Sequence, residues 1–396
     1  MKDNSKSIKN MKNKSVIASV LISCIIFLVF IGILEIVLRT THLFGAKTSY
    51  LKPDPILGYR FIPGHKYWHL KENDHPVSDK INSFGWRDKE WSLKKSPNTY
   101  RVAVLGDSMV ESADIESDRT FIALTENQLN RDGNHKVELM NFGLSNISQA
   151  EELLILKNDI ARFSPDMVIL FFFPGNDIDD MAKETASHIK RPFFHISESG
   201  ELTLDTRFSR TGHYKIKRLI NLFKRHSALI NLIGERYQGY KEYRRNKAMN
   251  MSDKNWKEAL PKYLSLCTTN PDQTFTKNYQ LNKLLIKAIA ECCREKSIRF
   301  MLVTVDLTPL YIPEYEKRNK SIDSTFDVNF FEDDLGSYAA PLNIEYLGLQ
   351  RIFRQAYENV GVPLHWNHWN YEGHKVVADA LAEKLKPILA SNKDEW

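Results

Sequence analysis

The sequence predicts an α/β fold: a three-layer α/β/α sandwich on a parallel, flavodoxin-like sheet, preceded by one transmembrane helix. Three observations predict it. From residue 100 onwards, short β-branched and apolar runs occur; amphipathic stretches of helical period separate them; and a long apolar segment lies near the N-terminus. Strands that alternate with helices are joined by right-handed crossovers, which place helices on both faces of a parallel sheet.

The composition is that of a globular protein with a substantial core. The 396 residues are 42% hydrophobic and 26% charged, with a net charge of +6, which does not point to a nucleic-acid partner. No C-x-x-C pair and no His/Cys metal-ligand spacing occurs, so we expect no metal and no cofactor. Of the four cysteines, Cys24 lies in the apolar segment; Cys267 either pairs with Cys292 or Cys293, or all three are buried core residues.

The N-terminal segment predicts a membrane anchor. Residues 1–15 carry five lysines, and residues 16–38 are apolar apart from small residues and Glu35. A cleavable signal peptide would have a shorter apolar core, and a lipoprotein would turn polar after Cys24. We therefore expect an uncleaved, single-pass signal anchor in the cell (inner) membrane, with a basic cytoplasmic tail at 1–15 and the rest of the chain extracytoplasmic, or periplasmic.

An extracytoplasmic arm is expected at residues 39–99. Five prolines exclude a long helix there. The segment 82–88 is too aromatic for a free linker, so we expect the arm to pack on the main domain.

The main domain is expected at residues 100–390. Strands are predicted at 101–105, 136–141, 167–173 and 298–305, with a last short one at 361–364, and helices at 109–130, 148–163, 279–296 and 372–389. A basic helical insertion at about 179–278 breaks this alternation. Its segment 207–247 carries twelve Lys or Arg against two Glu and predicts one or two amphipathic helices. These helices either meet anionic headgroups or an acidic glycan, or form a solvated insertion that covers the sheet.

Four polar blocks follow predicted strands or precede the last helix. They are Gly106-Asp107-Ser108, Asn141-Phe142-Gly143, Gly175-Asn176-Asp177 and the segment 368–374. Because the carboxyl ends of parallel strands share one edge, these blocks should meet there. Acyl transfer needs a nucleophile, a base and donors for an oxyanion. Ser108 and His368 are the predicted catalytic pair. The Ser108 and Gly143 amides and the Asn176 side chain form the predicted oxyanion hole.

In these four ordered blocks the sequence resembles the SGNH, or GDSL, hydrolase superfamily, although the third block lacks the spacer of the G-x-N-D pattern. The arm segment 82–88 and the His-Trp-Asn form of the last block resemble the membrane-anchored, envelope-facing branch. The resemblance implies the SGNH hydrolase fold and selects His368, which lies five residues before Gly373. It implies a serine esterase or O-acyltransferase that acts on acyl esters, acetyl esters first among them, of a cell-envelope glycan or lipid.

The expected acid is missing. The superfamily usually has an Asp two or three residues before the histidine, where this chain has Trp366 and His365. Either the site is a Ser–His dyad without an acid, or the carboxylate that orients His368 comes from Glu372 or from the insertion. Loss of the acid costs a triad about 10⁴ in turnover. The other possible function is therefore a catalytically degenerate protein that binds envelope polysaccharide or partners.

Several neighbouring residues have two interpretations. Asp107 and Asp177 are expected to cap backbone amides at tight turns, not to catalyse. Trp366 and Trp369 either stack on a sugar ring or wall the sheet edge. His374 is expected to be structural, and His365 to be a partner of His368 or a rim residue. Ser112 stands where many relatives have Gly. The expected partners are the membrane and an acylated substrate, without nucleic acid, and the oligomeric state stays open.

Overall fold

The computed structural model describes residues 2–70, 72, 75–131, 136–248, 267–268 and 273–391. The chain divides into two compact units, which are described one at a time. One unit combines Met1–Ser49 with Leu219–Met251, and the other combines Tyr50–Arg218 with Ser252–Trp396.

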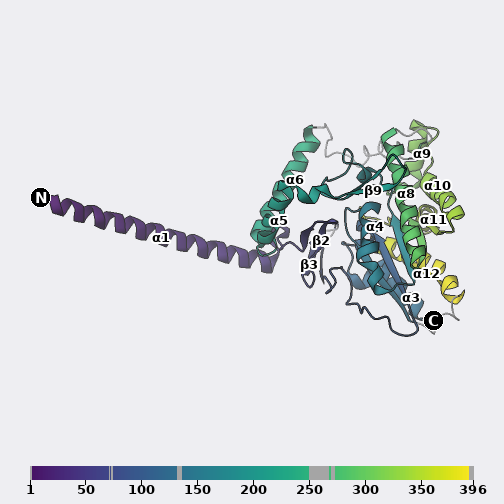
Figure 1. Cartoon of the computed structure of the whole chain (residues 1–396), viewed down its shortest axis with the longest axis horizontal. Coiled ribbons are helices and arrows are strands. Elements are labelled where there is room, and N and C mark those ends of the chain that lie inside the picture. Colours follow the sequence, from purple (N-terminus) through teal and green to yellow (C-terminus); the bar gives the residue numbers. More distant parts are fainter. Residues whose placement is uncertain are drawn as a thin grey trace. The chain divides into compact units, whose positions relative to one another are not determined.

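A five-stranded parallel sheet is the centre of the larger unit (Figure 1). In spatial order its strands are β11 (Glu345–Gly348), β10 (Arg299–Thr304), β7 (Met167–Phe172), β5 (Thr99–Gly106) and β6 (Lys136–Gly143). All four neighbouring pairs are parallel. This is the flavodoxin-like order, in which the direction of winding reverses between the first and third strands, β5 and β7. The predicted fold class is confirmed, and this reversal marks the sheet edge where ligands bind in such folds.

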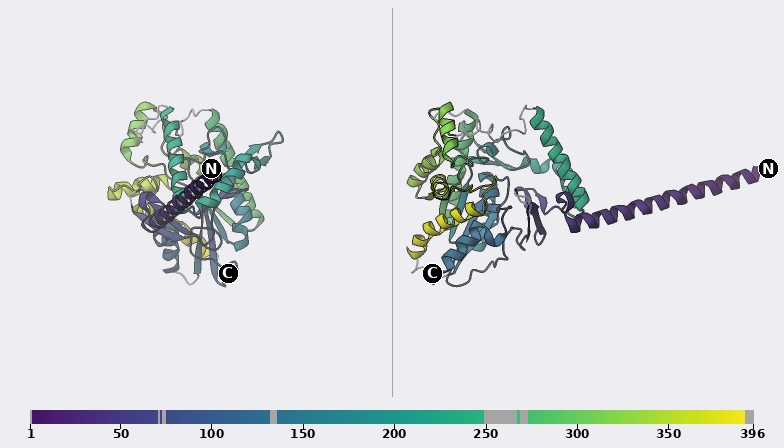
Figure 2. Two further views of the ribbon diagram at one scale, coloured as in Figure 1. Left: turned by 90° about the vertical axis from the view of Figure 1, so that its left-hand side faces the viewer. Right: turned by 180° about the vertical axis from the view of Figure 1, so that it is seen from behind.

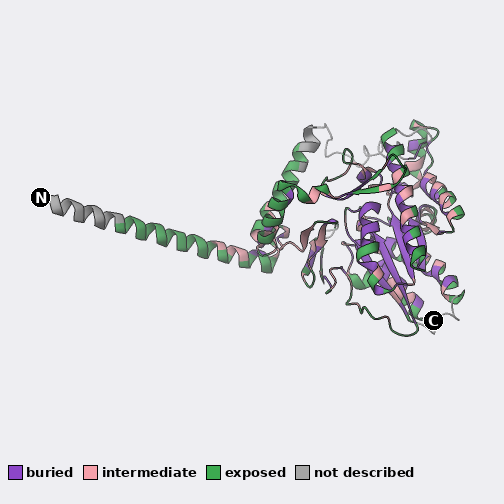
Figure 3. Cartoon of the chain, viewed as in Figure 1, coloured by how far each residue is buried: buried purple, intermediate pink, exposed green. Residues whose placement is uncertain are grey.

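Both faces of the sheet are buried, as their colour in Figure 3 shows. Alternate residues of β7 belong to opposite cores: Val168 and Leu170 to one, Ile169 and Phe171 to the other. Helices α4 (Gln149–Asn158), α8 (Gln273–Glu295) and α10 (Phe330–Ala339) contribute to the first core. Helices α3 (Phe121–Arg131), α11 (Gln350–Val360) and α12 (Tyr371–Ser391) contribute to the second. Figure 2 shows the layers from two further directions.

Two predicted elements are wrong. The expected helix over 109–130 is two helices, α2 (Ser108–Glu111) and α3, because Ser112 ends α2 in a left-handed conformation with φ 55°. The last strand is β11, and residues 361–364 form no strand. The alternating run of β11 is only four residues long and half-buried, so its sequence signal is weak.

The arm folds into two antiparallel hairpins. One joins β1 (Leu51–Asp54) to β2 (Gly58–Phe61), and the other joins β3 (Lys66–Leu70) to β4 (Pro76–Lys80). Tyr67, Ile81 and Trp86 of the arm belong to the first core of the sheet. The Trp86 ring packs edge-on against Phe142 of β6, with their centroids 5.1 Å apart. The arm therefore packs on the main domain, as its aromatic content predicts.

The basic insertion contains the hairpin β8 (Phe193–Ile196) to β9 (Leu202–Asp205), then α5 (Gly212–Lys224) and α6 (Ala228–Ala248). Residues 249–266 of the predicted insertion lie outside the described residues. The two predicted amphipathic helices are present. Both interpretations of the insertion, a surface for anionic headgroups or an acidic glycan and a solvated cover of the sheet, stay predictions.

The smaller unit is built around α1 (Lys2–Thr41). Among the described residues, one segment, Lys14–Thr41, is long and apolar enough to cross a membrane. A signal sequence near an N-terminus has the same length and composition. Leu38 and Ala46 pack with Ala228 of α6 in a small apolar cluster.

All four cysteines are free, with Cys24 exposed and the other three buried.

Candidate active site

Ser108 and His368 meet at the edge of the sheet. Strand β5 ends at Gly106, and Ser108, half-buried, opens α2. The Ser108 Oγ lies 2.9 Å from Nε2 of His368, which precedes α12. A hydroxyl and an imidazole nitrogen at this distance are the nucleophile and general base that acyl transfer requires.

The acid that orients the imidazole comes from the arm. Glu72 Oε1 lies 2.8 Å from His368 Nδ1. The other oxygen, Oε2, accepts the backbone amides of Asn367 at 2.6 Å and His368 at 2.9 Å. Glu72 therefore holds both the ring and the backbone of the histidine. Glu372, considered from sequence, is exposed on α12, and the described residues of the insertion supply none of these contacts.

A second carboxylate supports Glu72. Asp114, buried in the loop after α2, accepts the backbone amide of Glu72 on Oδ1 at 2.9 Å. Its Oδ2 lies 3.6 Å from His368 Nδ1. Ligand atoms of Glu72, Asp114 and His368 all lie within 4.8 Å of one another, the one group with metal-ligand proximity among the described residues. The hydrogen bonds within the group account for this proximity.

The carboxylates set the charge of the site. Burial lowers the pKa of His368, but the hydrogen bond and charge of Glu72, with the charges of Asp107 and Asp114, more than offset it, so the net pKa is raised. Burial also opposes ionisation of Glu72, but its bonds to His368 lower its pKa to about 2. Glu72 is thus ionised at neutral pH, with its negative charge next to the imidazole of His368.

The loop of His368 is held by a buried carboxylate. The backbones of His365 and Trp369 pair in an antiparallel bridge, which closes the loop that contains His368. Asp306 accepts the Trp369 Nε1–H at 2.9 Å and lies 3.3 Å from Nε2 of His365. His365 is therefore neither a partner of His368 nor a rim residue. Trp369 is fully buried, so its predicted contact with substrate is wrong and it walls the sheet edge.

The other two aromatic neighbours differ from Trp369. Trp366 is half-buried beside the base, and its backbone amide donates to the His368 carbonyl at 2.9 Å, so it stays a candidate for substrate contact. His374 is structural, as expected: its Nδ1 accepts the Phe121 amide at 3.0 Å, and burial lowers its pKa to about 3.

Two of the three predicted oxyanion donors are suitably placed. The Ser108 amide belongs to the first residue of α2, where N–H groups lack intrahelical acceptors. Asn176 follows β7, and its Nδ2 donates to Asp107 Oδ2 at 2.9 Å. Because an amide NH₂ has two hydrogens, this bond fixes the side chain and leaves one hydrogen for a ligand. Asp107 also caps the Met109 amide, and Asp177 accepts the Phe173 amide, so both carboxylates have the expected structural roles.

The third predicted donor, Gly143, has another role. Its amide already donates to Asn141 Oδ1 at 2.8 Å. A Cβ at this position would lie 2.1 Å from the Glu111 nitrogen, so glycine lets α2 approach the end of β6. The next two amides, of Leu144 and Ser145, donate to Gly106 O and Glu111 Oε2. The Gly143 amide is therefore not available to an oxyanion in this structure.

The arm also supports the helix of the nucleophile. Arg87, fully buried, donates to the carbonyls of Glu111 at 2.9 Å, Ser112 at 2.6 Å and Ile115 at 2.5 Å. Tyr67 donates its hydroxyl to Glu111 Oε1 at 2.9 Å. The left-handed turn at Ser112 is thus held by side chains of the arm.

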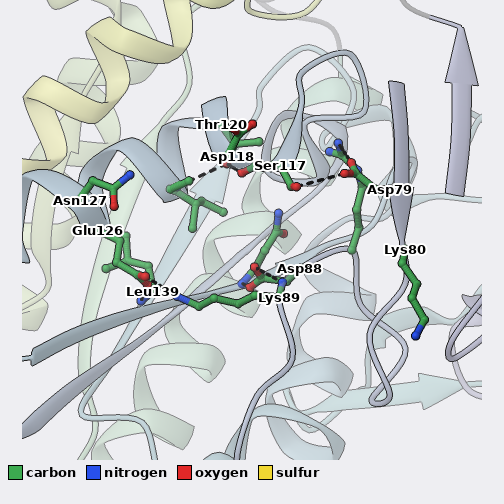
Figure 4. A pocket seen from close by; sticks show the side chains of 14 residues that line it. Asp79, Lys80, Asp88, Lys89, Ser117, Asp118, Thr120, Glu126, Asn127 and Leu139 are labelled. Carbon is green, nitrogen blue, oxygen red and sulfur yellow. Dashed lines mark hydrogen bonds and ion pairs between the residues drawn. The ribbon is translucent and has the colours of Figure 1, made fainter. Parts of the chain in front are cut away.

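A cavity of about 360 Å³ lies beside this support, between the arm, α3 and β6 (Figure 4). Its walls include Asp79, Lys89 and Glu126, and neither Ser108 nor His368 lines it. Lys89 pairs with Glu126, and Asp79 accepts the Ser117 hydroxyl. These wall groups bond to one another, which is typical of a seam between packed segments.

The chain is similar in fold to GDSL lipolytic proteins and esterases. A lipolytic protein of the G-D-S-L family from Desulfitobacterium hafniense is 15% identical, with a TM-score of 0.35, over 72% of this chain and 99% of that one. The psychrotrophic esterase EstA from Pseudoalteromonas sp. is 12% identical, with a TM-score of 0.36, over 74% and 99%. The acetyl xylan esterase AlAXEase is 13% identical, with a TM-score of 0.40, over 72% and 98%. No family model and no curated protein matches the sequence.

Proposed function

We propose that the protein is a serine ester hydrolase or O-acyltransferase of SGNH type, which works through an acyl-Ser108 intermediate. The observation that carries the proposal is the continuous chain of hydrogen bonds from Ser108 through His368 to Glu72. The chain of bonds lies where the winding of the sheet reverses, between β5 and β7. The proposed catalytic residues are Ser108, His368 and Glu72.

The chemistry follows from the positions of these groups. His368 Nε2 takes the Oγ proton as Ser108 forms a bond to the ester carbonyl carbon. The Ser108 amide and Asn176 stabilise the oxyanion. Collapse breaks the bond to the leaving oxygen, which receives the proton from His368. Water, or a hydroxyl of an acceptor, then gives up a proton to His368 and attacks the acyl-serine, and the serine leaves with that proton.

The proposed substrates are acyl esters, acetyl esters first among them, of a cell-envelope glycan or lipid. The proposed location is the cell (inner) membrane, with α1 as a single-pass anchor and the catalytic domain on the periplasmic side. The basic, then apolar, order of residues at the N-terminus supports this orientation. Trp366, half-buried beside His368, offers an aromatic face to a sugar ring. The contact of Glu72 with His368 supports the enzyme over a catalytically degenerate protein, because degeneracy rests on the lack of an acid close to His368 in sequence.

A fluorophosphonate probe tests the nucleophile. We expect the full-length protein to be labelled, Ser108→Ala not to be labelled, and Ser209→Ala, a matched change outside the site, to be labelled as the native protein is. Turnover of p-nitrophenyl acetate should be lost in His368→Ala. A folded native protein that reacts with neither reagent would contradict the proposal. Release of acetate in water, against transfer to an added oligosaccharide, separates the hydrolase from the acyltransferase.

A further inference from the structure

Helix α5 has an apolar face that the described part of the chain leaves uncovered. Ile216, Leu219, Ile220 and Phe223 recur at helical spacing, and Leu219 and Phe223 are 57% and 56% exposed. Figure 3 shows most of this helix in the colour of exposed residues. Side chains of this size at one face normally meet another apolar surface.

The rest of α5 is basic. Lys215, Lys217, Arg218 and Lys224 lie in the helix and Arg225 follows it, while the helix has no Asp or Glu. An apolar stripe beside lysines and arginines, with no acidic residue, is the pattern of a helix that lies in a membrane interface, with its apolar side in the acyl boundary and its cations at anionic headgroups.

The turn after α5 is hydrogen-bonded to the last turns of α1, and the last residue of α5 to the segment that follows α1. Ser49 donates its amide to the Lys224 carbonyl at 3.0 Å, and Arg39 donates to the carbonyl of His226. Glu35 accepts the amides of Ala228 at 2.7 Å and Leu229 at 3.0 Å. Glu35, the acidic residue within the apolar segment, therefore caps α6 and fixes the turn between α5 and α6.

This attachment sets the depth of α5. Glu35 and Arg39 lie in the last two turns of the apolar segment Lys14–Thr41, where a spanning helix leaves the hydrocarbon core. The turn that directly follows α5 is bonded to these residues. The C-terminal end of α5 therefore lies at the level of the headgroups, on the side of the membrane that holds the part of the chain after α1.

We propose that α5 is an interfacial helix: it lies in the outer headgroup region of the membrane that α1 spans and binds anionic lipid. The inference uses α1 as a membrane span but does not depend on the catalytic activity. The membrane is favoured as the occupant over a soluble glycan, because sugars do not cover aliphatic faces such as Leu219 and Ile220. It is favoured over a second copy of the chain, because the basic side chains of the two copies would then lie close together and repel one another.

The depth of labelled side chains in the bilayer tests the proposal. In a Cys24→Ser background of the full-length protein, Ile220→Cys places a fluorophore on the apolar face, and Arg218→Cys is the matched control on the opposite face. The native Cys24, labelled in the unaltered chain, reports separately whether α1 lies in the hydrocarbon core. The protein is reconstituted in phosphatidylcholine vesicles with and without phosphatidylglycerol, each containing lipids brominated along the acyl chain.

We expect quenching at position 220 to exceed that at 218 by roughly twofold or more, and to increase with phosphatidylglycerol. Cys24 should be quenched in both vesicle types. Equal quenching at 220 and 218 while Cys24 is quenched would overturn the proposal for α5 and leave the anchor intact. Quenching at 220 that appears only at high protein-to-lipid ratios would assign the apolar face to a second copy. Protection of position 220 by an acidic polysaccharide alone would assign the face to a glycan. Either outcome would overturn the proposal. Failure of Cys24 to be quenched would overturn the anchor as well as the interfacial helix.

Discussion

Glu72 Oε1 lies 2.8 Å from His368 Nδ1, although 296 residues separate the two along the chain. The arm at residues 39–99 thus supplies a carboxylate to the imidazole of His368. The same arm supplies Arg87 to the turn after the nucleophile. Catalytic competence should therefore depend on the arm as well as on the α/β domain.

Glu72→Gln should lower ester turnover by about 10²- to 10⁴-fold, because the imidazolium loses its ionised partner. The raised pKa of His368 predicts that kcat/KM rises with pH through a value above the ordinary histidine pKa of about 6.5. The charge of Glu72 contributes to that raised pKa, so in Glu72→Gln the acidic limb should move to lower pH while the plateau falls. Steady-state pH profiles measure both effects.

Glu372→Gln is the control, since Glu372 is exposed and close in sequence to the base. It should leave the profile unchanged. A profile in which Glu372→Gln lost activity and Glu72→Gln kept it would reverse the assignment of the acid.

The sequence contains enough to place the nucleophile and base, but not the acid. Ser108 and Asn176 directly follow strands of clear apolar pattern, and His368 directly precedes a long helix, so sheet topology brings all three together. Glu72 lies in the connection between two short arm strands, with no fixed spacing to His368. Only the packing of Tyr67 and Trp86 into the sheet core brings that connection to the site, and such packing is not encoded in a local pattern.

Asn176→Ala should lower kcat by about 10²- to 10³-fold with little change in KM, because its amide donor acts on charge that develops in the transition state. The variant also removes the partner of Asp107, so its folding must be compared with the native protein by circular dichroism. A folded variant with native kcat would exclude Asn176 as an oxyanion donor.

Gly143→Ala should destabilise the fold by roughly 1–3 kcal/mol or more, because the added Cβ would lie 2.1 Å from the Glu111 nitrogen. Gly212→Ala is the matched control, since a Cβ there meets nothing within 4 Å. Thermal unfolding of both variants provides the comparison. An equally stable Gly143→Ala protein that loses activity would instead favour a direct role for Gly143 in the site.

Gly143 shows why a glycine at a strand end is ambiguous in sequence. A bare backbone suits both the approach of a ligand and the approach of a helix, and the pattern Asn-Phe-Gly is the same in either case. The distinction depends on where α2 runs, and α2 is only four residues long. The same limit applies to the two tryptophans, whose roles depend on which of them faces the core.

Trp366→Ala and Trp369→Ala should therefore have different effects. Trp369 is fully buried, and its Nε1–H is bound by Asp306, so its removal should cost about 3–5 kcal/mol of stability and lower the melting temperature. Trp366 is half-buried, so Trp366→Ala should leave the melting temperature nearly unchanged. If Trp366 stacks on a sugar, its loss should raise KM for an acetylated oligosaccharide and leave KM for p-nitrophenyl acetate unaltered. An equal rise for both substrates would assign Trp366 to the shape of the loop around His368 and not to recognition of a sugar.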